Sequence, residues 1–104
     1  MSSSLISKAF QLFGSEAPEQ ASAWMQAIQG LSEASALDEK THALAYISVL
    51  AALRLESGIP YHVMHAKKIG ASREEIISAI LVGLPAAGNQ VTSSLPAALQ
   101  IYDE

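Results

Sequence analysis

The chain has 104 residues, of which 50% are hydrophobic and 15% are charged, with a formal net charge of -4 and no cysteine. Its length suits a single domain, residues 1–104, and its composition excludes a disordered chain. The net negative charge and the absence of any Lys/Arg-rich run argue against nucleic acid as a partner. The lack of cysteine excludes disulfides, thiolate metal sites and cysteine nucleophiles.

Apolar residues recur with helical spacing along nearly the whole chain, and no run alternates with period two, which predicts an all-α fold. The first expected helix follows the serine caps at residues 2–4 and ends at Gly14. The second begins near Pro18, a favourable first-turn residue, and ends before the polar segment SEAS at residues 32–35.

The third expected helix is the central one. It begins after its N-cap, Asp38, and runs to about Glu56. Its middle, ALAYISVLAAL (residues 43–53), is apolar all round, as in a helix that packs on several sides. The segment SGIP then interrupts it, because Gly58 and Pro60 both disfavour a continuous helix.

Shorter helices are expected in the remainder, which brings the total to about six around a helical hairpin. One spans residues 60–69, the capping box SREE at 72–75 begins another that runs through Leu84, and the last runs from near Ser94 to Tyr102.

The apolar content also bears on assembly and location. It leaves more hydrophobic surface than one small domain easily hides, which predicts a homo-oligomer. The longest charge-free apolar run, residues 43–53, is well short of the ~18 to 20 residues that span a bilayer. The N-terminal segment MSSSLISKAF lacks the pattern of a secretion signal. We therefore expect a cytoplasmic protein with no membrane segment.

Three segments, LDEKTHALAYISVLAAL, HVMHAKKIGASREEI and AILVGLPAAG, resemble the carboxymuconolactone decarboxylase family, which includes the alkylhydroperoxidase branch. The resemblance covers roughly residues 37–100. Its specific part is His62, followed eight residues later by Gly70 and then by the capping box. It implies an alkylhydroperoxidase-like subunit built around a helical hairpin and assembled as a homo-oligomer, with a hexamer expected first and a dimer or trimer next.

The residues at the family's reactive positions differ in this chain. The resemblance implies a CxxC pair seven and four residues before the histidine in the thiol-peroxidase branch, where this chain has Leu55 and Gly58. That branch also places a glutamate where this chain has Ala43, and the decarboxylase branch tends to place a carboxylate at the position of Gly58. Of the family's usual site, only His62 stands in its expected place.

His62 is the first catalytic candidate. It lies about two residues into its helix, where the positive helix end disfavours a charged imidazole, so we expect a neutral ring that can accept a proton. If it lines a pocket, its ring should face the groove between the 60–69 helix and the central helix or a neighbouring subunit, with one nitrogen held by a protein group. The structural alternative places both nitrogens in permanent protein hydrogen bonds.

Four further residues complete the candidate site. Glu56 is a candidate proton-transfer partner of His62, although a glutamate at a helix end is more often a solvated surface residue. His65 lies one turn after His62 on a neighbouring ridge, Tyr61 can hydrogen-bond a ligand, and Arg54 belongs to a basic segment that favours a small anionic molecule. We expect no metal, because zinc normally takes three protein ligands and this histidine pair has only Glu56 as a conceivable third. We also expect no cofactor.

Two functions are consistent with these residues. The first is an enzyme of the decarboxylase (lyase) kind, in which His62 moves a proton on a small carboxylate or lactone in a pocket at a subunit interface. The second is a non-catalytic oligomeric module that kept the fold. A thiol peroxidase comes third, because its redox cycle needs a thiolate that no side chain of this sequence supplies.

Overall fold

The computed structural model describes residues 5–104, and every regular element within them is a helix, as predicted. The serine caps expected at 2–4 lie outside the described residues. The first described helix, α2 (Lys8–Glu16), begins instead at Ser7, whose Oγ accepts a hydrogen bond from the Phe10 N–H at 3.1 Å. Within residues 5–104, no helix is long and apolar enough to cross a membrane.

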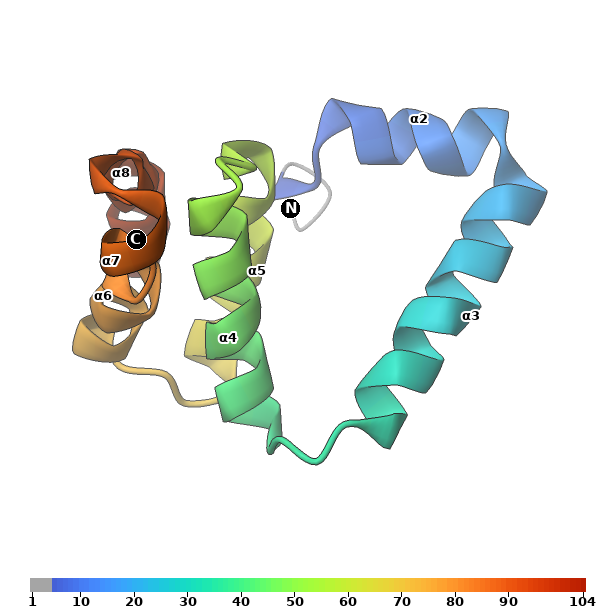
Figure 1. The fold of residues 1–104 in the computed structure, drawn as a ribbon. Helices are drawn as coiled ribbons and strands as arrows, with labels where there is room; N and C mark the ends of the chain where they lie inside the picture. Colours follow the sequence, from blue (N-terminus) through green and yellow to red (C-terminus); the bar gives the residue numbers. More distant parts are fainter. Residues whose placement is uncertain (1–4) are drawn as a thin grey trace.

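Helices α2 and α3 (Pro18–Ala34) form an arm, residues 8–34, that stands away from the rest of the chain (Figure 1). The prediction that the first helix ends at Gly14 was wrong. The helix continues to Glu16, because a glycine inside a helix costs only about 1 kcal/mol and does not by itself end it. No residue of either helix is fully buried.

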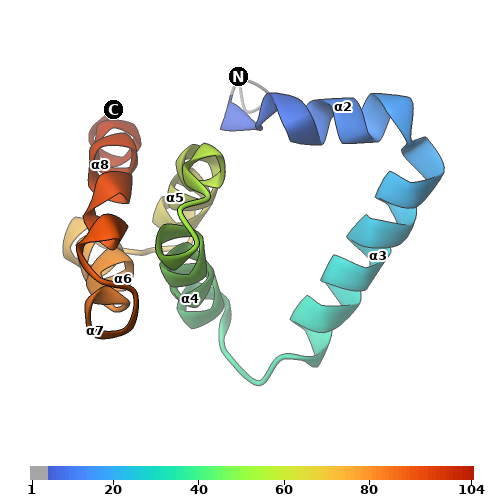
Figure 2. The same cartoon turned by 45° about the horizontal axis from the view of Figure 1, so that its top comes forward.

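The remaining residues, 39–103, form the body. Its α4 and α5 make the predicted helical hairpin, α6 and α8 cover one side of that hairpin, and the arm lies on the other side (Figure 2). The elements of the body are α4 (Glu39–Ala52), η1 (Glu56–Gly58), α5 (Ile59–Lys68), α6 (Arg73–Leu81), α7 (Leu84–Ala87), η2 (Asn89–Ser94) and α8 (Leu95–Asp103).

The core lies between the hairpin and the helices that cover it. Helix α4 contributes one face to it, and the fully buried large side chains include Ile47, Ile59, Val63, Ile76 and Ile80. The opposite face of α4 is also apolar but stays exposed. Helix α4 therefore has two hydrophobic sides, of which the subunit itself covers one.

The helix starts that the sequence predicts are confirmed by their caps. Asp38 accepts a hydrogen bond from the Thr41 N–H at 2.7 Å, and this bond lowers the pKa of the Asp38 carboxyl. At the start of α6, Ser72 and Glu75 form both hydrogen bonds of the capping box. Glu75 also pairs with Lys40 at 3.1 Å, so the starts of α4 and α6 are tied together.

Two helix ends differ from the prediction. The helix expected through Leu84 is split: α6 ends at Leu81, and α7 follows with Pro85 in its first turn. A continuous helix would bring the Pro85 ring against the carbonyl of Leu81. Helix α4 ends at Ala52, before the expected Glu56.

The end of α4 is a Schellman motif with arginine in the place that glycine usually takes. The Leu55 N–H bonds to the Leu50 carbonyl at 2.9 Å and the Arg54 N–H to the Ala51 carbonyl at 3.2 Å. Arg54 has φ 60°, and it is the one residue other than glycine with a positive φ among residues 5–104. Helix α5 ends in the same motif with Gly70, whose φ is 105°.

We expect Arg54→Gly to raise the free energy of unfolding by about 0.5–1 kcal/mol, because glycine adopts the left-handed conformation without steric strain. The matched change Gly70→Ala should lower it by about 1 kcal/mol, since it introduces that strain at the end of α5. Thermal unfolding followed by circular dichroism measures both. Destabilisation by Arg54→Gly would show that the arginine side chain itself holds the end of α4.

Candidate functional site

His62 lies near the start of α5, on the side that faces α4. Pro60 occupies the first turn of this helix and fixes its start. The His62 imidazole is partly buried, and its ring centroid lies 4.6 Å from that of Tyr46 on α4 and 5.2 Å from that of Tyr61. The Tyr61 ring meets it edge-on, at an interplanar angle of 84°. Two aromatic rings thus frame one imidazole.

Neither ring nitrogen of His62 has a protein hydrogen-bond partner within residues 5–104, and neither is sealed from solvent. The protein group expected to hold one nitrogen is therefore not supplied by the described residues of this subunit. The physical reason is the nature of the neighbours, which are aromatic rings, the backbone at Gly58 and, beyond it, the apolar side chain of Leu50. The structural alternative, with both nitrogens permanently bonded, is not observed either.

The environment keeps this imidazole neutral. Burial lowers the pKa of His62 below its ordinary value of 6.5, and the nearby charge of His65 lowers it further. The sequence predicted a neutral ring from the helix start, whereas burial is the larger cause. A neutral imidazole with an open nitrogen is a proton acceptor near pH 7.

Glu56 does not reach His62. It lies at the start of η1, exposed to solvent, and its carboxylate accepts a hydrogen bond from the Ser93 hydroxyl. No hydrogen bond joins Glu56 to His62. A carboxylate that is already bonded to η2 is not arranged as a partner for this imidazole.

His65 and Tyr61 lie together on the outer side of α5. With Leu5, Met64 and Lys68 they line a small open groove. No hydrogen bond or ion pair within the described part of the chain engages the His65 ring. Among residues 5–104, no three His, Cys, Asp or Glu side chains converge as metal ligands would.

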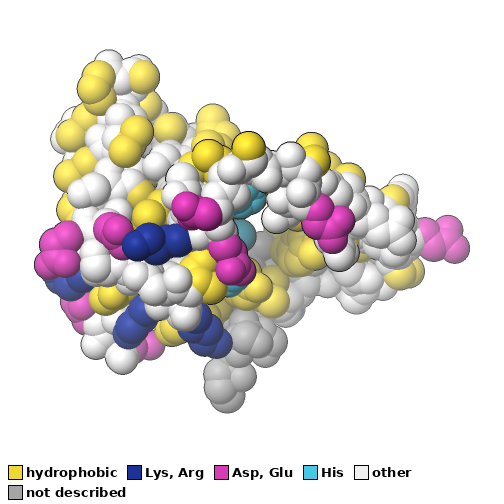
Figure 3. All heavy atoms as spheres, turned by 90° about the horizontal axis from the view of Figure 1, so that it is seen from below, with side chains coloured by type: hydrophobic (Ala, Val, Ile, Leu, Met, Phe, Trp, Pro, Cys, Tyr) yellow, Lys and Arg dark blue, Asp and Glu magenta, His cyan; other side chains and the backbone are white. Residues whose placement is uncertain are grey.

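The four basic residues between positions 54 and 73 divide into two groups. Arg73 pairs with Asp103 on α8, and Lys67 donates to the Tyr102 carbonyl at 2.6 Å, so both serve to hold α8. Arg54 and Lys68 form no ion pair within the described residues and remain available to an anion. Viewed from below, histidine side chains lie in the hollow between the body and the arm (Figure 3).

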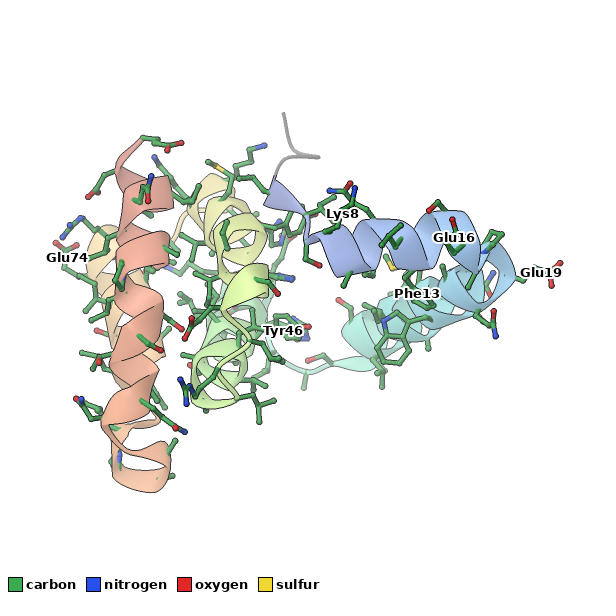
Figure 4. All side chains as sticks on the ribbon, turned by 90° about the horizontal axis from the view of Figure 1, so that it is seen from above. Lys8, Phe13, Glu16, Glu19, Tyr46 and Glu74 are labelled. Atoms are coloured by element: carbon green, nitrogen blue, oxygen red, sulfur yellow. The ribbon has the colours of Figure 1, made fainter. Side chains whose placement is uncertain are left out.

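Tyr46 could also hydrogen-bond a ligand, but the sequence did not place it in the candidate site, because an aromatic residue on an apolar helix is usually a core residue. It is 44% exposed and projects from α4 toward the side on which the arm lies (Figure 4). Tyr46 lies three residues after the buried Ala43 and four before the buried Leu50, so helical spacing alone gave no signal that could have separated it from the core.

The family model described as Carboxymuconolactone decarboxylase family matches residues 18–100. This chain belongs to the carboxymuconolactone decarboxylase family. The comparisons with curated proteins and with solved structures gave no match. The family match confirms the resemblance seen in the sequence and extends it from residue 37 back to residue 18, so that it includes all of α3.

As a carboxymuconolactone decarboxylase family member, the chain departs from the expected site in a defined way. Ala43, at the position implied for a glutamate, is buried in the core. A Cβ placed on Gly58, at the position implied for a carboxylate, would lie 3.9 Å from the His62 Cδ2 atom. The missing carboxylate would therefore have stood directly beside the histidine that this family member keeps.

Proposed function

We propose that this family member is a cysteine-independent lyase in which His62 moves a proton on a small carboxylate or lactone. A neutral imidazole can take a proton from the carbon next to a lactone carbonyl. Loss of CO2 leaves an electron pair on carbon, to which the conjugate acid returns its proton, and water supplies the second proton that replaces the carboxylate. The observation that carries the proposal is the partly buried His62 ring, framed by Tyr46 and Tyr61, with both nitrogens free of protein partners.

An anionic substrate suits the basic residues that precede and follow His62 in the sequence. Arg54, Lys68 and His65 have no acidic partner within the described residues, whereas Glu56 is bonded to Ser93. Arg54 is also held in a backbone conformation that is unfavourable for a residue with a side chain. Such strain is frequent at ligand-binding positions. We assign Arg54 and His65 to the substrate carboxylate, with Tyr61 as a further hydrogen-bond donor.

The pocket is completed by a neighbouring subunit. Tyr46 and His62 lie on the side of α4 that the subunit's own core does not cover, and large exposed apolar faces normally mark interfaces. A homo-oligomer, with a hexamer expected first, would close this side over the substrate.

The test is turnover of a panel of small lactone carboxylates and β-keto carboxylates, with CO2 release measured across pH. Protonation removes the base, so kcat/KM should rise with pH through the lowered pKa of His62 and be level above about 6.5. A rate that falls as pH rises through this window would contradict His62 as the base. No binding and no turnover with any member of the panel would contradict the lyase function.

The second candidate is a non-catalytic oligomeric module. The observation in its favour is the absence of a carboxylate at the histidine, because Glu56 is bonded to Ser93 and position 58 is glycine. This candidate predicts assembly without binding of any panel member. A peroxidase function has no such support, since the chain contains no cysteine.

A further inference from the structure

Helix α3 carries an apolar stripe that no part of its own subunit covers. Trp24, Ile28 and Leu31 follow one another at helical spacing, with Met25 beside them, and Leu31 is 73% exposed. Between Glu19 in the first turn and Glu33 in the last, the helix carries no charged residue. A surface helix of this kind, uncharged over its middle and apolar on one side, is built to pack against another surface.

The outer face of α4 is a second uncovered apolar surface. Tyr46, Val49 and Leu53 share this face, and the last two are 48% and 63% exposed. From Thr41 to Leu53 the sequence contains no Asp, Glu, Lys or Arg. The face lies on the side of the body toward which the arm extends, yet α3 packs chiefly on α2 and stands apart from α4 (Figures 1 and 4).

The exposed area matches what a stable dimer buries. The whole chain exposes 6658 Å², whereas a folded monomer of 11.0 kDa exposes about 5,600 Å². The excess of about 1,000 Å² exceeds the roughly 800 Å² that each partner contributes to a standard interface. The family match begins at residue 18, so it includes the docking helix α3 in the family's domain but not α2.

We propose that the arm of one subunit docks through α3 on the outer face of α4 in a second copy of the chain, and that the second copy returns the same contact. One chain carries both surfaces, so two copies can make the contact reciprocally and close as a two-fold symmetric pair. Tyr46 lies on the docking face and contacts His62, so the partner's arm covers the His62 site. The role of His62 rests on the function proposed above, but the docking does not.

The test introduces one glutamate into each of the two surfaces, in separate variants, and a control glutamate on the opposite side of α3. Ile28→Glu and Val49→Glu should each weaken association at least 100-fold in sedimentation equilibrium, because either change buries an unpaired charge. Gln26→Glu adds the same charge on the opposite side of α3 and should leave association unchanged. A monomeric wild type, retained association in both variants, or an equal loss in the control would overturn the proposal.

A cross-linking experiment decides the matter should a glutamate variant fail to fold. The chain has no cysteine, so single-cysteine variants Ile28→Cys and Val49→Cys can be mixed and oxidised without background. A disulfide between the two different chains supports docking on a second copy. A disulfide formed within one chain by the double variant, with no cross-link between chains, would overturn it. Neither result depends on turnover, so the experiments can contradict the docking proposal without contradicting the lyase proposal, and the reverse.

Discussion

Replacing His62 by glutamine should lower kcat by about 10²- to 10⁴-fold on any substrate that the wild type turns over. Glutamine keeps a polar side chain of similar reach but cannot accept a proton at neutral pH. Helix content and oligomer size should be unchanged, because no protein hydrogen bond within residues 5–104 depends on the imidazole. Steady-state kinetics, circular dichroism and sedimentation measure the three properties on one preparation.

His65→Gln provides the comparison on the same helix. Its expected effect is a higher KM with kcat nearly unchanged, because His65 is assigned to binding and not to proton transfer. If His62→Gln instead prevents folding or assembly while ligand binding per folded subunit persists, His62 is a structural residue. The non-catalytic module would then be the better description.

Ile47→Ala should lower the free energy of unfolding by about 2–5 kcal/mol. Ile47 is fully buried on the core face of α4, which packs on α5, α6 and η2, so truncation leaves a cavity that these elements cannot readily close. A chain of this length has a total stability of about 5–15 kcal/mol, so the change removes a large part of it. Urea unfolding, followed by circular dichroism at fixed protein concentration, gives the value.

The milder change Ile47→Val should cost about 0.5–1.5 kcal/mol, because it removes one methyl group from the same site. A loss below 1 kcal/mol for Ile47→Ala would mean that the neighbours of α4 collapse into the space. That result would contradict the rigid packing of the hairpin against α6.

Much of the fold could be predicted because helix starts are encoded locally. Asp38 and the Ser72–Glu75 box each bond to a backbone N–H three residues away or less, and the sequence displays that spacing. The end of α4 could not be predicted, because Arg54 takes a backbone conformation that signals glycine in a sequence. In the structure, the hydrogen bonds from the Leu55 and Arg54 N–H groups to the Leu50 and Ala51 carbonyls hold that conformation.

The site was predictable only in part. His62 was found through its spacing to Gly70 and the capping box. Its neutral state was predicted from its place near a helix start, whereas burial is the first cause of its lowered pKa. The ring contact with Tyr46 joins two helices, and the hydrogen bond from Ser93 to Glu56 joins residues 37 positions apart. Such pairs depend on how helices cross, which local spacing does not determine.

The arm, in which no residue is fully buried, should open before the body does. Because α2 and α3 pack chiefly on each other and bury no residue fully, they are stabilised mainly by their own hydrogen bonds, and isolated helices of 9 and 17 residues are marginal in water. The body keeps its complete core when the arm melts. The free subunit is therefore two cooperative units, in which backbone amides of the arm exchange with solvent through local opening long before those of α4 and α5.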